Sequence, residues 1–300
     1  MKSLRRRLEE VSKASGIRLD ILQQDYLLSW VLVGISRVKE LSAMLVLKGG
    51  TALKKCFFGD YRFSEDLDFT ALEKDLAGQQ KMNRLFQNVH KITQEIVQEH
   101  AAIDLFFENY KEKTPHPKNQ QAYVVRAKFP WQREALTTVM IEISYDEDVC
   151  LPILERSIFH SYGEIIEDKV NCYSLEEIII EKLRAIIQNT KKMHERGWSR
   201  SRVRDYYDIL NIFKSYEDKV DLTLIGKFLE RKFAKKSVMF PSTADFFDPI
   251  IMQQIKTSWN NWLSPLTVKV PMYEEALKEL KQIVSNIIDS IQIQYTNNKN

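Results

Sequence analysis

Residues 45–70, LVLKGGTALKKCFFGDYRFSEDLDFT, decide the fold and the chemistry expected of this chain. The stretch opens on an apolar run typical of a buried strand. It then passes through a Lys-Gly-Gly-Thr turn and a helical segment, and closes on an acidic run. Alternate side chains of a strand share a face, so Asp66 and Asp68 should project to one side while Leu67 and Phe69 anchor the other. The stretch therefore predicts a strand, a turn, a helix and a second strand, in that order.

The carboxylates of Asp66 and Asp68 point to a divalent cation. Two neighbouring carboxylates repel each other unless a cation lies between them. Mg2+ prefers such oxygen ligands, usually one or two carboxylates with substrate phosphates completing its coordination. An Asp-x-Asp pattern alone is common by chance, and an ordinary strand is its usual explanation.

The glycine turn supplies the other half of a phosphate site. Gly49 and Gly50 can adopt backbone angles closed to other residues, and they let a ligand approach the main chain closely. A helix that begins at Thr51 would present free N–H groups to an anion. At this separation, and with Ser64 before the acids, the turn and the acidic pair together indicate a nucleotidyl-transfer site.

The two motifs resemble those of the AbiEii/AbiGii nucleotidyltransferase toxin family, which includes the MenT toxins. That family is marked by a K-G-G-T-x-L turn followed by R-x-S-x-D-L-D-F, and residues 48–53 and 62–69 match both nearly letter for letter. The resemblance implies that Asp66 and Asp68 are catalytic metal ligands. It also implies nucleotide binding by six further residues: Lys48, Gly49, Gly50, Thr51, Arg62 and Ser64.

A third acidic ligand is expected on a neighbouring strand. In the predicted strand 137–145, Glu142 lies between two isoleucines that would point to the opposite face, and we expect its carboxylate to be partly buried. A buried carboxylate needs a partner or a metal. The family has an acid at this point, more often Asp, which ligates a metal and can help to activate the attacking hydroxyl. Asp146 is the rival candidate, with Glu147 and Asp148 beside it where the strand should end, and a plain salt bridge is the structural alternative.

Two further family motifs follow in the C-terminal half. A capping box at residues 174–177 opens a helix predicted over 175–188, which carries Lys182 in an E-K-x-x-A pattern. Residues 202–209 match R-x-R-D-x-Y-D-[IL] and open another helix. The resemblance implies that Lys182 neutralises charge on the transferring phosphates, with Asp205 orienting Lys182 or a substrate hydroxyl. A solvated helix lysine and an intrahelical ion pair are the structural alternatives.

The composition is that of a globular protein. Of 300 residues, 44% are hydrophobic and 28% are charged, and the formal net charge of +3 neither demands nor excludes nucleic acid. Three widely spaced cysteines, Cys56, Cys150 and Cys172, predict reduced thiols in a cytoplasmic protein. The charged N-terminus predicts no signal peptide, and no apolar run reaches the ~20 residues that span a membrane.

The sequence also predicts the structure of several other segments. Residues 1–42 are predicted to be helical, with Asp25 on the polar side, and residues 189–200 are predicted to form a loop. The arginine run at residues 5–7 suits either RNA phosphates or a solvated helix end. The same two alternatives apply to a second basic cluster interleaved with aromatics, which comprises Arg231, Lys232, Lys235 and Lys236 beside Phe233 and Phe240.

We therefore expect an α+β fold similar to the polymerase-beta-like nucleotidyltransferases. A mixed sheet with flanking helices should occupy residues 1–170, and a helical C-terminal lobe residues 171–300. The cleft between them should hold an NTP and Mg2+, or Mn2+ in its place. The resemblance implies a toxin with a cognate antitoxin that transfers NMP from an NTP to an acceptor, which is the tRNA 3′ end in the MenT branch. The alternatives are transfer to a protein or a small molecule, and a non-catalytic relative that binds a partner.

Overall fold

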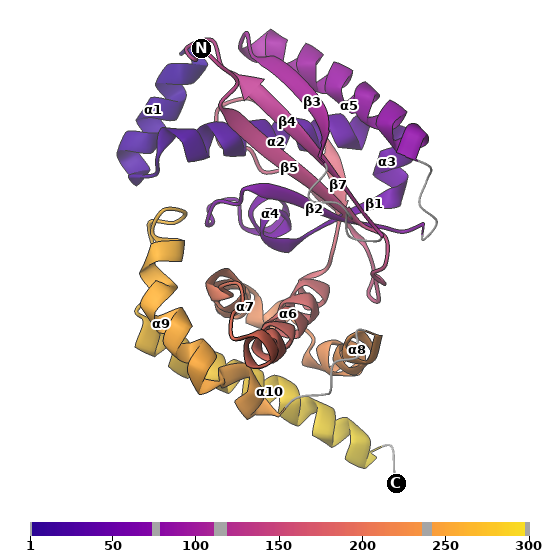
Figure 1. Cartoon of the computed structure of the whole chain (residues 1–300), viewed down its shortest axis with the longest axis vertical. Helices are drawn as coiled ribbons and strands as arrows, with labels where there is room; N and C mark the ends of the chain where they lie inside the picture. The colour runs from indigo at the N-terminus through magenta and orange to yellow at the C-terminus, as the bar shows by residue number, and fades with distance from the viewer. Residues whose placement is uncertain (1, 74–78, 111–118, 236–241, 298–300) are drawn as a thin grey trace. The chain divides into compact units, whose positions relative to one another are not determined.

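The computed structural model describes residues 2–73, 79–110, 119–235 and 242–297. The chain divides into two compact units (Figure 1). The first unit comprises Met1–Tyr173 and Leu266–Val268, and the second comprises Ser174–Pro265 and Lys269–Asn300. In the part of the chain that is described, no helix is both long and apolar enough to cross a membrane.

The first unit is built on a seven-stranded mixed sheet with the order β3-β4-β5-β2-β1-β7-β6. The strands are β1 (Leu45–Lys48), β2 (Asp66–Ala71), β3 (Asp104–Tyr110), β4 (Gln120–Lys128), β5 (Thr137–Ser144), β6 (Leu154–Ser157) and β7 (Lys169–Cys172). Strand β2 runs parallel to β5, and β1 runs parallel to β7, whereas the other neighbours are antiparallel. The strand with the acidic pair, β2, therefore lies in the interior of the sheet between β5 and β1. The predicted α+β class is confirmed.

Helices flank this sheet (Figure 1). They are α1 (Leu4–Ser15), α2 (Leu19–Arg37), α3 (Lys39–Met44), α4 (Gly49–Ala52), the π-helix η1 (Leu53–Phe58) and α5 (Gln79–His100). Helix α2 packs against α5 and contacts β5, and it is buried on almost all sides, as expected of a helix that is apolar all round. The helical stretch predicted at residues 1–42 is divided because Gly16 ends α1 in the left-handed region, at a φ of 70°.

Asp25 of α2 lies in the core, so its expected place on a polar helix face was wrong. Its side chain is only 4% exposed, and the Lys55 ammonium of η1, itself 2% exposed, donates to its carboxylate at 2.7 Å. Tyr162 donates to the same carboxylate oxygen at 2.9 Å. Burial alone would raise the pKa of Asp25, but the ammonium groups of Lys55 and Lys54 outweigh burial and hold the pKa below its usual value. A buried charge is tolerated when it is paired in this way.

The regular elements of the second unit are all helices in the part of the chain that is described. They are α6 (Leu175–Arg196), α7 (Val203–Tyr216), η2 (Glu217–Lys219), α8 (Leu222–Lys235), η3 (Thr243–Phe247), α9 (Pro249–Leu263) and α10 (Tyr273–Asn297). Helix α6 packs against α7 and α8, α10 packs against the same two helices, and α7 also packs against α9. The Ser174 hydroxyl caps α6 by accepting from the Glu177 N–H, as predicted. Pro249 stands in the first turn of α9.

The loop predicted at residues 189–200 is largely helix. Helix α6 continues to Arg196 because the segment holds no helix breaker before Gly197, and because Met193 extends the buried face of the helix. Gly197 then ends α6 with a φ of 74°, and its N–H donates to the Met193 carbonyl at 2.8 Å. Only the short connection from Gly197 to α7 is non-helical.

The basic cluster on α8 is not the exposed RNA-binding set that its sequence allows. Lys232 and Phe233 are buried, and the Lys232 ammonium lies 2.7 Å from Glu177 and 2.5 Å from Glu181. Arg231 and Lys235 are exposed. The remaining two members, Lys236 and Phe240, lie outside the described residues.

The arginine run of α1 makes ion pairs within the chain. Arg5 pairs with Glu9 and Arg6 with Glu10, one helical turn later in each case. Arg7 is more enclosed, and its guanidinium lies 2.6 Å from the Glu164 carboxylate. These contacts favour the structural explanation of the run.

Candidate active site

The glycine turn closes around two side chains of the protein itself. Gly49 follows β1 with a φ of 73°, and a Cβ atom there would lie 3.1 Å from Oδ2 of Asp68. A Cβ atom on Gly50 would collide with the guanidinium of Arg62. Glycine is favoured at position 49 by the positive φ, and at position 50 an added Cβ would require the buried Arg62 guanidinium to move. The turn and the acidic strand, which the sequence separates, are thus in contact.

Strand β2 presents its two aspartates on one face, as the alternation predicted. Leu67 and Phe69 are fully buried on the other face, whereas Asp66 is exposed and Asp68 is half-buried. Asp68 lies opposite Lys48 on β1 and opposite Glu142 on β5. Three predicted site residues therefore stand side by side across three neighbouring strands.

Glu142 is exposed, so the expected partial burial of this carboxylate was wrong. Its neighbours Ile141 and Ile143 are fully buried on the opposite face of β5, and the residues on the Glu142 face remain accessible. Only one face of the sheet is covered at this point. Glu142 nevertheless shares the register of Asp68, whereas the rival Asp146 lies beyond the end of β5.

The carboxylates on the accessible face of β2 supply part of what a divalent cation needs. Within residues 2–73, 79–110, 119–235 and 242–297, no three His, Cys, Asp or Glu side chains are grouped closely enough to hold a metal ion by themselves. A magnesium ion bound to nucleotide requires fewer protein ligands, because phosphate oxygens and waters complete its shell. Asp66 and Asp68, two carboxylates on one face, fit a site of this kind.

The predicted nucleotide-binding residues have different local roles. Lys48 forms an ion pair with Glu147 at 2.5 Å. The buried Arg62 guanidinium lies over Gly50 and donates to the Phe63 carbonyl at 3.2 Å. Lys48 and Arg62 therefore place two cations beside the glycine turn. Ser64 is half-buried just before β2.

Thr51 ties the turn to the acidic strand. Its buried hydroxyl donates to the main-chain carbonyl of Asp66. Its immediate contact is therefore structural, since it fixes the first residue of β2 against the start of α4.

Two residues that sequence patterns did not single out also hold this region together. The Gln24 amide of α2 donates to the carbonyls of Glu65, at 3.0 Å, and Thr138, at 2.8 Å, and so joins the starts of β2 and β5. The Lys54 ammonium donates to the carbonyls of Gly59 and Tyr61 and lies 3.9 Å from the centre of the Phe63 ring. Burial lowers the pKa of Lys54. Neither residue has a local pattern that reveals its partners.

In the second unit, Lys182 of α6 lies between two carboxylates of α7. Its ammonium is 3.0 Å from Asp205 and 2.6 Å from Asp208. Asp208 is fully buried, while Asp205 is more accessible and also accepts from Arg202 at 3.3 Å. The contact between Lys182 and Asp205 is the one expected from the sequence, and Asp208 is an additional partner.

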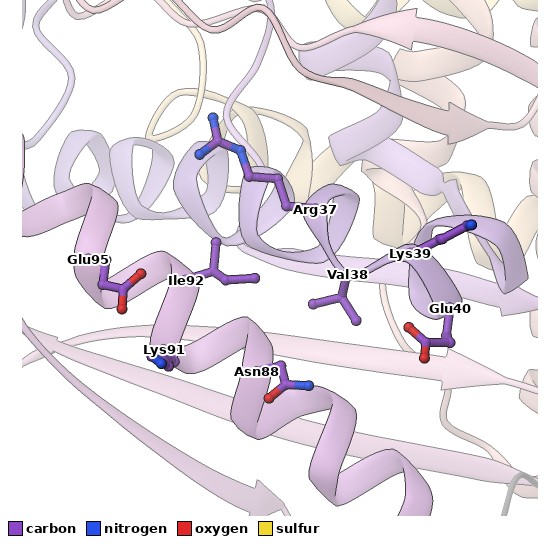
Figure 2. Close-up of a pocket in the computed structure, with 8 residues that line it drawn as sticks. All are labelled: Arg37, Val38, Lys39, Glu40, Asn88, Lys91, Ile92 and Glu95. Carbon is purple, nitrogen blue, oxygen red and sulfur yellow. The ribbon is translucent and has the colours of Figure 1, made fainter.

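A pocket of about 330 Å³ in the first unit lies on other elements (Figure 2). It is lined by residues from the end of α2, from α3 and from α5, namely Arg37, Val38, Lys39, Glu40, Asn88, Lys91, Ile92 and Glu95. Arg37 points away from Asn88 and Lys91 (Figure 2), and it pairs with Asp168 at 2.9 Å. No predicted site residue lines this pocket.

Comparisons with known proteins agree with the fold. The structure resembles that of MenT4, a nucleotidyltransferase toxin from Mycobacterium tuberculosis H37Rv, with a TM-score of 0.58 and 16% sequence identity over 96% of this chain and 98% of that chain. An antigenic nucleotidyltransferase-like protein from Paracoccidioides brasiliensis matches 73% of this chain and 97% of its own, with 16% identity and a TM-score of 0.33, which is too low to establish a shared fold. None of the curated proteins compared with this sequence matches it.

A family model supplies the assignment. The model described as nucleotidyl transferase AbiEii toxin, type IV toxin–antitoxin system, matches residues 30–283. This range covers most of the chain and includes all four motifs. The chain therefore belongs to the AbiEii family of nucleotidyl transferase toxins of type IV toxin–antitoxin systems.

Proposed function

We propose that this nucleotidyltransferase toxin is metal-dependent and transfers NMP from an NTP to the 3′ end of tRNA. The proposal rests on the position of Asp68. The register of the sheet sets Asp68 beside Glu142, and the Asp68 carboxylate also lies against Gly49 of the glycine turn. A carboxylate pair that contacts a glycine turn suits the binding of a nucleoside triphosphate and its cation. Membership of a type IV toxin–antitoxin system implies a cognate antitoxin.

Asp66 and Asp68, together with phosphate oxygens of the NTP, would hold Mg2+, or Mn2+ in its place. Glu142, which lies opposite Asp68 in the sheet, is the candidate for a third ligand. Such an ion, when bound, stabilises the charge that develops on the attacking and leaving oxygens. The exposed face of β2 leaves both aspartates accessible to a nucleotide.

The turn residues would bind the triphosphate. Gly49, Gly50 and Thr51 present the main chain, while Lys48 and Arg62 place positive charge beside it. Ser64 would contribute a hydroxyl close to the acidic strand. An ammonium or guanidinium near the transferring group neutralises its negative charge.

The reaction forms one bond and breaks one. The acceptor hydroxyl oxygen attacks the α-phosphorus, its proton passes to a base, and the bond from the α-phosphorus to the bridging oxygen breaks to release pyrophosphate. Glu142 is the accessible carboxylate that could take the proton. Lys182, oriented by Asp205, would add positive charge in this step.

The test is nucleotide transfer by the full chain. Each labelled NTP is incubated with protein, Mg2+ and total tRNA, and the products are separated on a denaturing gel. We expect label in tRNA with the intact chain, and none with Asp66→Ala or after chelation of the metal. The matched control is Asp104→Ala, which removes an exposed carboxylate from edge strand β3 of the same sheet and should leave transfer unchanged.

The other results each point elsewhere. Label on protein or on a small molecule, with tRNA unlabelled, would replace the tRNA acceptor. Absence of any transfer with every NTP would favour a non-catalytic relative that binds a partner. Transfer that survives both Asp66→Ala and chelation would refute the metal site.

A further inference from the structure

The end of α6 and the connection to α7 carry a concentrated positive charge. Between residues 191 and 204 stand six Lys and Arg residues and one acid, Glu195, whereas the whole chain has 44 basic and 41 acidic residues. Such local concentration, rather than net charge, is the electrostatic footprint of a nucleic-acid surface.

Much of this charge is not used inside the protein. Lys192, Arg196 and Arg200 are exposed, and they make no ion pair or hydrogen bond with any residue that the structure describes. By contrast, Lys191 lies near Glu195, and Arg202 pairs with Asp205. Three cations therefore remain available to an external anion.

An indole projects from the middle of these cations. The side chain of Trp198 follows the α6 cap and is 65% exposed, although tryptophan is highly buried on average. Gly197 turns the chain in its left-handed conformation, and the Asn189 amide donates to the Ser199 hydroxyl at 3.1 Å. The contacts on either side of Trp198 fix the backbone that presents it.

A second exposed aromatic lies against another cation of this segment. The Arg204 guanidinium of α7 lies 5.2 Å from the ring centre of Trp262, which is itself exposed on α9. His194 of α6 also holds this region together, because it lies 2.8 Å from Asp248 at the start of α9. The basic segment is thus fixed to a neighbouring helix.

A helix-dipole role explains only part of this arrangement. Cations in the last turn of a helix are favourable, which accounts for Arg196 but not for Lys192, four residues earlier. It does not account for Arg200, which lies beyond the helix, nor for an exposed indole. Exposed bases stack on aromatic side chains while cations track the phosphates, so the combination fits a single-stranded polynucleotide.

We propose that Lys192, Arg196, Trp198 and Arg200, here called the basic–aromatic surface, bind a single-stranded segment of the RNA acceptor. This proposal rests on the proposed transfer to tRNA. Trp198 stacks on a base, and the three cations contact neighbouring phosphates. The basic cluster on α8 is a weaker candidate because its Lys232 and Phe233 are buried.

The test measures binding without nucleotide or metal. A fluorescent single-stranded RNA of about 12 nucleotides, within the range that such surfaces cover, is titrated with the full chain, and anisotropy is followed at several salt concentrations. Trp198→Ala should weaken binding about tenfold, and Trp198→Phe, which keeps a stacking ring, should restore most of it. Arg196→Glu combined with Arg200→Glu should reduce the slope of log affinity against log salt by about 1.4.

The matched control changes the same charge elsewhere in the second unit. Lys227→Glu combined with Lys278→Glu reverses two exposed cations of α8 and α10 and should leave the salt slope near that of the unmodified chain. A duplex of the same sequence should bind more weakly, because its bases are already stacked. Circular dichroism confirms that each variant is folded.

Several results would overturn the proposal. These are no binding of single-stranded RNA by the unmodified chain, equal binding by Trp198→Ala, or an equal loss in the control pair. A change in oligomeric state with Trp198→Ala, at unchanged RNA affinity, would assign the indole to a protein contact.

The binding assay also separates this proposal from the proposed reaction. Variants that lose RNA binding while an RNA-transfer assay of the unmodified chain remains negative would support the surface without the activity. Normal RNA transfer and normal RNA binding by the surface variants would retain the activity and reject the surface.

Discussion

Arg62 and Gly50 constrain each other, which makes the glycine a test of the turn. Alanine at position 50 would favour helix by up to about 1 kcal/mol. Its Cβ would, however, force the buried Arg62 guanidinium to move. We expect Gly50→Ala to destabilise the chain by about 1–3 kcal/mol, as overpacking does, in urea unfolding followed by circular dichroism.

The control for this prediction is the same substitution without the guanidinium. In an Arg62→Ala background, Gly50→Ala should be neutral or slightly stabilising, so the double-mutant cycle should show a coupling energy. A stabilising Gly50→Ala in the unmodified chain would mean that Arg62 is not confined against this turn.

Residue patterns predicted part of this site and could not predict the rest. The period-two alternation around Asp66 and Asp68 is local, and it placed both carboxylates on one face. The requirement for Gly50 comes from a side chain 12 positions later, and the role of Gln24 depends on carbonyls of two distant strands. Such partners are fixed by tertiary packing and leave no periodic signal.

At the scale of elements, Lys182 joins α6 to α7 through two carboxylates of unequal burial. Removing one partner of a buried pair leaves an uncompensated charge. We expect Asp208→Asn to destabilise the chain by about 3 kcal/mol, measured by urea unfolding. Asp205→Asn should cost about 1 kcal/mol or less, because its site is more accessible to water.

The two aspartate variants should rank differently in activity and in stability. Asp208→Asn should be the less stable variant, and Asp205→Asn should be the less active one. If Asp205 orients Lys182 in the reaction, Asp205→Asn should lower kcat at concentrations and temperatures where the protein is fully folded. Lys182→Met should lower kcat as well. Equal stability of the two aspartate variants would contradict the difference in burial between them.

The elements themselves were largely predictable from apolar periodicity. The strand expected at 137–145 is β5, and the helix expected over 175–188 is the first part of α6. The exceptions have physical causes. Helix α6 extends past Gln188 because the Met193 side chain is buried. Lys232 is buried because its charge is paired with Glu177 and Glu181. The sheet order depends on pairing between distant segments, and the exposure of Glu142 depends on which face of the sheet is covered. A single strand reveals neither.

A buried polar network links distant parts of the first unit and should make its stability depend on pH. Arg7 and His160 hold the pKa of Glu164 well below its usual value, although burial opposes them, and Tyr26 donates to the same carboxylate at 3.0 Å. Burial lowers the pKa of His160. Asp25, paired with Lys55, also has a lowered pKa.

These three shifts act in the same direction. As pH falls, each group takes up a proton in the unfolded chain before it does so in the folded chain, so the free energy of unfolding decreases. The decrease should begin near the ordinary histidine pKa of 6.5 and continue through 4.5 and 3.8, the ordinary values of Glu and Asp. We expect Glu164→Gln to be less stable at neutral pH but to show a shallower acid slope in urea unfolding. An unchanged slope would exclude Glu164 as a source of the pH dependence.

At the scale of the whole molecule, the lack of a preformed three-ligand cluster among the described residues predicts how metal and nucleotide bind together. A ligand that binds only the folded chain raises its stability in proportion to the logarithm of one plus the ratio of free ligand concentration to Kd. Mg2+ alone should shift the thermal midpoint little, because Asp66 and Asp68 provide only part of a magnesium shell. The cognate NTP with Mg2+, at about 100 times its Kd, should raise the midpoint by about 5–10 °C, measured by scanning calorimetry.

The same addition should have little effect on the Asp66→Asn and Asp68→Asn double variant. A large shift with Mg2+ alone, or an equal shift in that double variant, would show that the cation binds without these two carboxylates.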